Sequence, residues 1–83
     1  MAESTYYVAL PFMLTDSVLA PGDAIECVSA SSAIMRAEAL ARLPGNVGAI
    51  AFSRTGNPDV GKFEDAIVLL KLGHVPDNLP MLY

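Results

Sequence analysis

One stretch decides the fold of this chain: Ser29-Ala-Ser-Ser-Ala-Ile-Met-Arg-Ala-Glu-Ala-Leu-Ala-Arg-Leu43, continued by Pro44-Gly45-Asn46 and Val47-Gly-Ala-Ile-Ala-Phe-Ser53. Its first part predicts an amphipathic helix, because apolar residues recur at spacings of three and four. These residues are Ala30, Ala33, Ile34, Ala37, Leu40 and Ala41. A serine at the start can cap the helix, and the Pro-Gly pair ends it. The last part, apolar on both faces, predicts a strand on which the helix packs.

The predicted buried face of this helix is mostly alanine. Small side chains let a helix axis come close to a sheet, but each buries little area. We therefore expect the sheet to supply the bulky side chains of the core. Gly48 leaves room for a close approach in the following strand, and we expect the helix to use that room.

Two further strands are predicted before the helix. Residues 5–14 are rich in the aromatic and β-branched types that favour extended chain. Pro11 cannot donate to a ladder, so this strand is expected to lie at an edge or to bend there. After a turn at 15–17 and a loop at 18–22, residues 23–28 form a short second strand.

The last periodic segment, residues 63–72, fits either a helix or a strand. We favour a strand, because 67–70 is a short apolar run bounded by glycines. The order β-β-α-β-β then predicts an α+β fold: a single helix packed on one face of an antiparallel sheet of three to four strands. We expect residues 1–83 to form one small domain, with a frayed N-terminus at 1–4 and an irregular tail at 73–83.

The composition is apolar and weakly charged. Hydrophobic residues make up 53% of the chain and charged residues 17%, with a net charge of -4. The five basic residues are scattered, which argues against a nucleic-acid surface. No apolar run reaches the roughly 18 residues of a membrane span, and the N-terminus does not resemble a signal peptide. We therefore expect a cytoplasmic protein.

The most polar stretch, residues 53–62, is the candidate ligand-binding site. Arg54 and Lys62 supply positive charge, Asn57 and Asp59 lie between them, and glycine N–H groups could donate to an anion. The order of a phosphate-binding P-loop is missing, because no Ser or Thr follows the lysine and no helix opens there. The interpretation that we favour is a hairpin loop whose residues serve turn geometry.

We expect no cofactor, no metal and no enzymatic activity. The oxygens available to calcium lack EF-hand spacing, and one Cys with one His cannot form a structural zinc site. The calcium candidates are Asn57, Asp59, Glu64 and Asp65. A hydrolase or thiol enzyme would need Cys27 or a serine beside His74, which sequence alone does not bring together. We expect Cys27 to be a small buried hydrophobe and His74 a surface or packing residue.

The layout resembles that of short bacterial and prophage proteins of unassigned function. The resemblance covers most of the chain and lies in five segments. They are Leu10-Pro11-Phe12, Ala37-Glu-Ala-Leu-Ala41, Gly48-Ala-Ile-Ala-Phe-Ser-Arg-Thr-Gly-Asn-Pro58, Gly61-Lys-Phe63 and Gly73-His-Val-Pro76. The resemblance implies a bacterial protein with the fold described above, and it implies no activity.

The pattern of apolar residues predicts a homodimer. The first and last strands are apolar on both faces, whereas a sheet with one wet face alternates. A single helix covers one face, so the other would stay open as an apolar patch that two copies can bury.

Two alternatives to that interface stay open. The copies could pair through the edge of the first strand, or the tail could fold over the open face. The tail residues concerned are Val75, Leu79, Met81, Leu82 and Tyr83. We therefore predict a small structural or protein-interaction module without catalytic activity that self-associates. The alternative is a small-ligand or anion-binding protein that uses the 54–62 turn.

Overall fold

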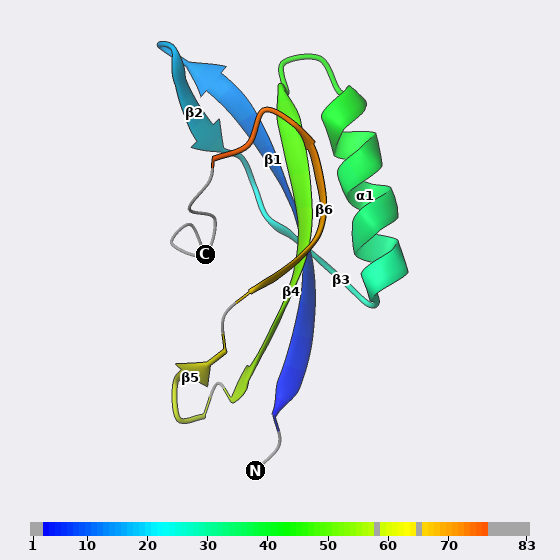
Figure 1. Cartoon of the computed structure of the whole chain (residues 1–83), viewed down its shortest axis with the longest axis vertical. Helices are drawn as coiled ribbons and strands as arrows, with labels where there is room; N and C mark the ends of the chain where they lie inside the picture. The colour runs from blue at the N-terminus through cyan, green and yellow to red at the C-terminus, as the bar shows by residue number, and fades with distance from the viewer. Residues whose placement is uncertain (1–2, 58, 65, 77–83) are drawn as a thin grey trace.

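The computed structural model describes residues 3–57, 59–64 and 66–76 and contains one helix on one side of an antiparallel sheet (Figure 1). The strands are β1 (Ser4–Thr15), β2 (Val18–Pro21), β3 (Ile25–Cys27), β4 (Gly48–Asn57), β5 (Lys62–Phe63) and β6 (Ile67–Gly73), and the helix is α1 (Ala30–Arg42). The predicted α+β class is confirmed. The sheet is larger than the three to four strands predicted, since it has six.

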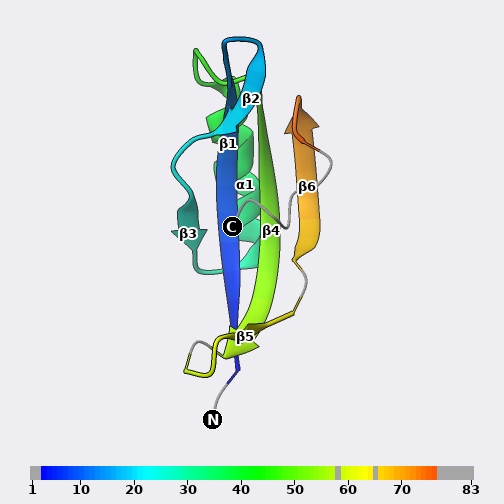
Figure 2. The ribbon, with the colours of Figure 1, turned by 90° about the vertical axis from the view of Figure 1, so that its left-hand side faces the viewer.

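The centre of the sheet is the long antiparallel pair β1 and β4. Both β2 and β3 pair with the free side of β1, while β5 and β6 pair with the free side of β4. The six strands therefore occupy four positions, and each edge position is divided between two short strands. Figure 2 shows β3 and β6 on either side of the central pair. The prediction that the first strand lies at an edge is wrong.

Pro11 fits in a central strand because the neighbouring strand is interrupted beside it. Its carbonyl oxygen accepts a hydrogen bond from the Gly22 N–H at 2.9 Å, so its backbone faces the β2–β3 side. There β2 has ended at Pro21 and β3 has not begun until Ile25. The missing N–H of Pro11 therefore points away from β4, where it costs no ladder bond.

Residues 18–21, predicted as part of a loop, form a strand that makes a hairpin with β1. Asp16 and Ser17 both have positive φ, at 51° and 67°. Two such residues form the type I′ turn that matches the twist of a tight hairpin. This hairpin was not predicted from the sequence, because its two turn residues are Asp16 and Ser17 and not the Asn-Gly pair typical of a type I′ turn.

The strand predicted at residues 63–72 is confirmed from Ile67, where β6 begins, and at Phe63, which ends β5; Glu64 and Ala66 lie in no strand, and Asp65 lies outside the described residues. The register along β4 shifts between Ala51, which pairs with Leu70, and Phe52, which pairs with Val68. Leu69 is therefore the extra residue of a β-bulge. Strict alternation would place Val68, Leu70 and Leu72 on one face, but after the bulge Val68 shares the face of Phe52, whereas Leu70 and Leu72 share the face of Ala51 and Ala49.

The helix begins and ends where the sequence indicated. The Ser32 N–H donates to the Ser29 Oγ at 3.1 Å, which confirms the serine cap. At the other end, the Asn46 side-chain amide donates to the Leu40 carbonyl at 2.8 Å, and Gly45 takes a φ of 93°. These contacts satisfy backbone groups that the end of a helix leaves without partners.

Helix and sheet meet through small side chains on both sides. Ala33 and Ala37 of α1 are fully buried against alanines of the two central strands, namely Ala9, Ala49 and Ala51. The prediction that the sheet supplies the bulky side chains of the core is confirmed, but the large side chains of β1 and β4 lie on the face away from the helix. Gly48 is approached by the Leu72 and His74 backbone and not by the helix, because a Cβ there would meet the Leu72 carbonyl at 2.7 Å.

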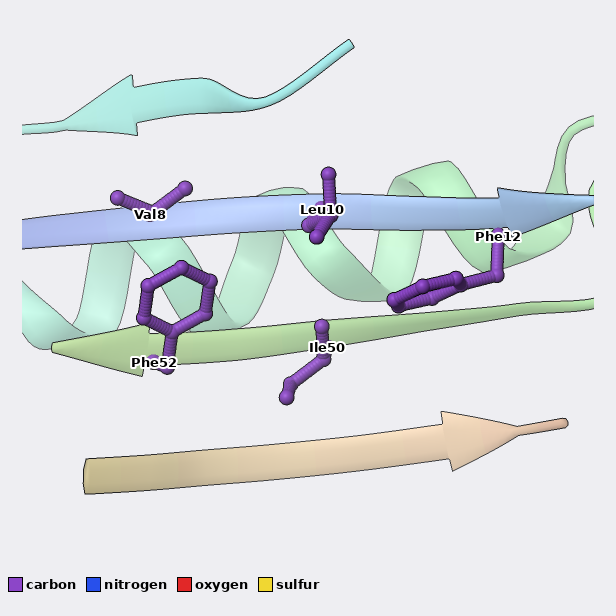
Figure 3. Close-up of a cluster of buried hydrophobic side chains, with 5 residues drawn as sticks. All are labelled: Val8, Leu10, Phe12, Ile50 and Phe52. Atoms are coloured by element: carbon purple, nitrogen blue, oxygen red, sulfur yellow. The ribbon is translucent and has the colours of Figure 1, made fainter. Parts of the chain in front are cut away.

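The bulky side chains form a second cluster on the face away from the helix (Figure 3). Its members are Val8, Leu10, Phe12, Ile50 and Phe52, and each is 5% exposed or less. Leu19, Ala66 and Val75 pack against them. The prediction that this face stays open is therefore wrong. Val75 lies where the tail alternative placed it, whereas Leu79, Met81, Leu82 and Tyr83 lie outside the described residues.

The alanine contact yields a prediction about steric tolerance. Ala37→Leu should lower the free energy of unfolding by about 1–3 kcal/mol, because extra methylenes in a packed interface force strain. Ala39→Leu is the matched control on the exposed side of the same helix and should change it by about 0.5 kcal/mol at most. Urea unfolding measures both. Equal effects would show that α1 does not sit closely on the sheet.

The second cluster yields a prediction about burial within one chain. Phe12→Ala should cost about 3–5 kcal/mol of unfolding free energy, because it leaves a cavity among buried side chains. Leu14→Ala, at an exposed position of the same strand, should cost about 0.5 kcal/mol or less. The measurement is urea unfolding of dilute protein. A Phe12→Ala effect that disappears on dilution would mean that a second copy, and not the chain itself, buries this ring.

Candidate functional site

The predicted ligand-binding turn is the hairpin between β4 and β5, in which Asn57 pairs with Lys62. The Asn57 Oδ1 accepts a hydrogen bond from the Asp59 N–H at 3.0 Å, and its carbonyl accepts from the Val60 N–H at 3.3 Å. Gly61 takes a φ of 70°, which favours glycine. These contacts are those of a turn-forming Asn, so Asn57 shapes the loop from within.

Arg54 lies against the ring of Phe63, with its guanidinium carbon 5.3 Å from the ring centroid. Its Nε–H also donates to the Glu64 carbonyl at 3.2 Å. The same ring lies 6.3 Å from the ring of Tyr6 and covers Gly56, where a Cβ would overlap it. Arg54, Phe63 and Tyr6 together hold the short strand β5 onto β4 through a cation–π contact and an aromatic contact.

The four predicted ligand-binding residues do not converge. Residues that face each other across a ladder share a face, so Phe63 and Arg54 lie on the face of the bulky cluster. Asn57 and Lys62 form the next pair along and lie on the opposite face. The pleat of the hairpin therefore separates the charges of Arg54 and Lys62. Asp59 is exposed in the loop between the strands.

The two candidate catalytic residues lie at opposite edges of the sheet. Cys27 ends β3 beside β1, while His74 follows β6 beside β4. Three strand spacings separate them across the sheet. They are also offset along it, because Cys27 pairs with Tyr7, the partner of Ser53, whereas the His74 N–H donates to the Val47 carbonyl before the start of β4. Cys27 packs against the alanine cluster, and its Sγ–H donates to the Ile25 carbonyl at 3.6 Å. The His74 side chain is exposed.

No cluster of metal-ligating side chains occurs among residues 3–57, 59–64 and 66–76. Asp65, one of the calcium candidates, lies outside these ranges. No described helix is long and apolar enough to cross a membrane. A hollow of about 320 Å³ lies on α1, and its described lining comes from the helix alone: Ser32, Met35, Arg36 and Ala39.

The feature that sequence analysis missed is the edge formed by β6. Among the described strands β6 pairs with β4 alone, so its other side pairs with no strand of residues 3–57, 59–64 and 66–76. Ile67 is 63% exposed and Val68 42% exposed, and Phe63 of the neighbouring β5 is 43% exposed. The apolar run at 67–70 was the available signal. The sequence analysis interprets this run as part of an apolar sheet face, whereas in the structure its exposed residues lie along the edge of the sheet.

Comparison with known proteins gives no match to this chain among family models, curated proteins or solved structures.

The hairpin geometry yields a prediction that separates two residues of equal charge. Arg54→Ala should lower the free energy of unfolding by about 1 kcal/mol, because it removes the contact with the Phe63 ring. Lys62→Ala removes the same charge from an exposed side chain and should cost about 0.5 kcal/mol or less. Thermal and urea unfolding measure both. Equal losses would show that net charge, and not the ring contact, sets the effect.

Proposed function

We propose that this chain is a small protein-interaction module without catalytic activity, and that its first partner is another copy of itself. The observation that supports the proposal is the apolar edge strand β6. An unpaired strand edge presents a row of backbone donors and acceptors, and soluble proteins usually protect such edges with charges, prolines or bulges.

The protection of this edge is slight. Within β6, Lys71 is the only charged side chain, and the bulge at Leu69 is the only irregularity of register. The remaining residues of the strand before Gly73 are Ile, Val or Leu. A monomer would keep this strand in water at a cost, because exposed apolar side chains gain roughly 1.5–3 kcal/mol each when fully buried.

The proposed interface differs from the one that the apolar pattern first indicated. The face away from α1 is buried within the chain, so it offers little further area to a second copy. The first strand is central and cannot serve as an edge. Association through β6 needs neither surface and leaves both buried clusters intact.

The proposal predicts concentration-dependent dimerisation. Light scattering over a series from low micromolar to near-millimolar chain should show the mass rising from one copy to two. Ile67→Lys should weaken the dimer about tenfold or more, because it removes an apolar side chain worth roughly 1.5–3 kcal/mol on burial. Leu14→Lys, at a comparably exposed site on β1, is the control and should leave the dimer unchanged.

A mass of one copy at every concentration would overturn self-association. Equal weakening by Ile67→Lys and Leu14→Lys would show that added charge, and not the β6 edge, controls assembly.

A further inference from the structure

We infer that two copies join by antiparallel pairing of their β6 strands about a two-fold axis, so that the two sheets become one. This inference rests on the proposed self-association and adds which backbone groups and which side chains meet.

The first step concerns which β6 residues direct their backbone outward. The His74 N–H donates to the Val47 carbonyl at 3.0 Å, so the backbone of His74 faces β4. Along a strand, the N–H and C=O groups of successive residues point to alternate sides. The backbone groups of Leu72 and Leu70 therefore point toward β4, and those of Lys71 point away from it. The register pairs Leu72 with Ala49 and Leu70 with Ala51, in agreement with this alternation.

The second step extends the assignment past the bulge. Ala51 faces β6, so the next residue of β4, Phe52, faces β1. Val68 lies opposite Phe52 in the register. Because the backbone of Phe52 faces β1, the alternation of an antiparallel ladder directs the Val68 N–H and C=O outward. Val68 and Lys71 are thus consecutive outward-facing positions of the edge, and the bulge at Leu69 lies between them.

A two-fold axis between these positions makes the edge complementary to itself. Val68 of one copy then lies opposite Lys71 of the second, and Lys71 opposite Val68, so that each pair can exchange two N–H···O bonds. The same register sets Ile67 opposite Leu72 of the second copy. Both residues lie on the helix side of the sheet, where they are the partners of Ser53 and Ala49.

The charges favour this arrangement over a parallel one. In-register parallel pairing would set Lys71 opposite Lys71 of the second copy, and facing like charges destabilise a sheet. Antiparallel pairing sets each Lys71 opposite a valine, whose side chain can cover the lysine methylenes.

The other edge of the sheet is a poorer partner for β6. It is broken between β2 and β3, it carries Pro21 at the break, and it holds the exposed acid Glu26 in β3. Pairing β6 with that edge would also be head-to-tail, and head-to-tail contacts give rings or open filaments and not a two-fold dimer. The continuous and nearly uncharged β6 edge therefore selects a second β6 as its partner.

Lys71→Pro tests the pairing, because proline removes an outward N–H without touching the bonds to β4. Lys71→Ala is the matched control, which removes the charge and keeps the N–H. Sedimentation equilibrium should show Lys71→Pro dimerising at least tenfold more weakly than Lys71→Ala, while urea unfolding of the two dilute variants should be similar. In the wild-type protein, amide exchange at Val68 and Lys71 should slow as concentration rises.

The outcomes separate this inference from the proposed function. A monomeric wild type overturns both. A wild-type dimer that survives Lys71→Pro with equal affinity overturns the β6 pairing and leaves self-association standing. Should Lys71→Pro not fold, amide exchange in the wild type decides, since unchanged rates at Val68 and Lys71 in the dimer would overturn the pairing.

Discussion

The close contact of α1 with β1 and β4 is the constraint on which the rest of the structure depends. Alanines meet alanines across this interface, with Ala33 and Ala37 on the helix side. Such a contact removes little area from water per residue, so it cannot supply most of the hydrophobic stabilisation of a small domain. Its effect is geometric, because it holds the helix against the two central strands and leaves no space for larger side chains between them.

The hydrophobic stabilisation comes instead from the opposite face, where β1 and β4 alternate small with large residues in phase. Phe12, Ile50 and Val8 are fully buried there. The sheet thus has one buried cluster on each of its two faces: the alanine cluster under α1 (Figure 1) and the bulky cluster on the opposite face (Figure 3). Because side chains of the chain itself bury both faces of the central strands, the apolar side chains of the sheet that stay exposed include those of β6. The proposed interaction therefore uses the β6 edge and not a face of the sheet.

The polar hairpin between β4 and β5 serves the same sheet. The Arg54 guanidinium contacts the Phe63 ring and donates a hydrogen bond to the Glu64 carbonyl. The Asn57 side chain accepts a hydrogen bond within the turn. The pleat sends Arg54 and Lys62 to opposite faces, which a list of polar residues does not reveal. The interpretation of this stretch as a hairpin loop of turn-forming residues is confirmed, and the geometry does not bring the charges of Arg54 and Lys62 together.

Sequence alone predicts the features that depend on neighbours close along the chain. The period of 29–43, the cap at Ser29 and the extended run at 67–70 all act over a few residues, so they can be read from the chain. Three features could not be predicted in this way: Pro11 lies in a central strand, Leu69 bulges, and the buried large and small side chains of β1 and β4 lie on opposite faces. Each of these depends on pairing between segments far apart in sequence, and a shift of one residue in register moves every side chain to the other face.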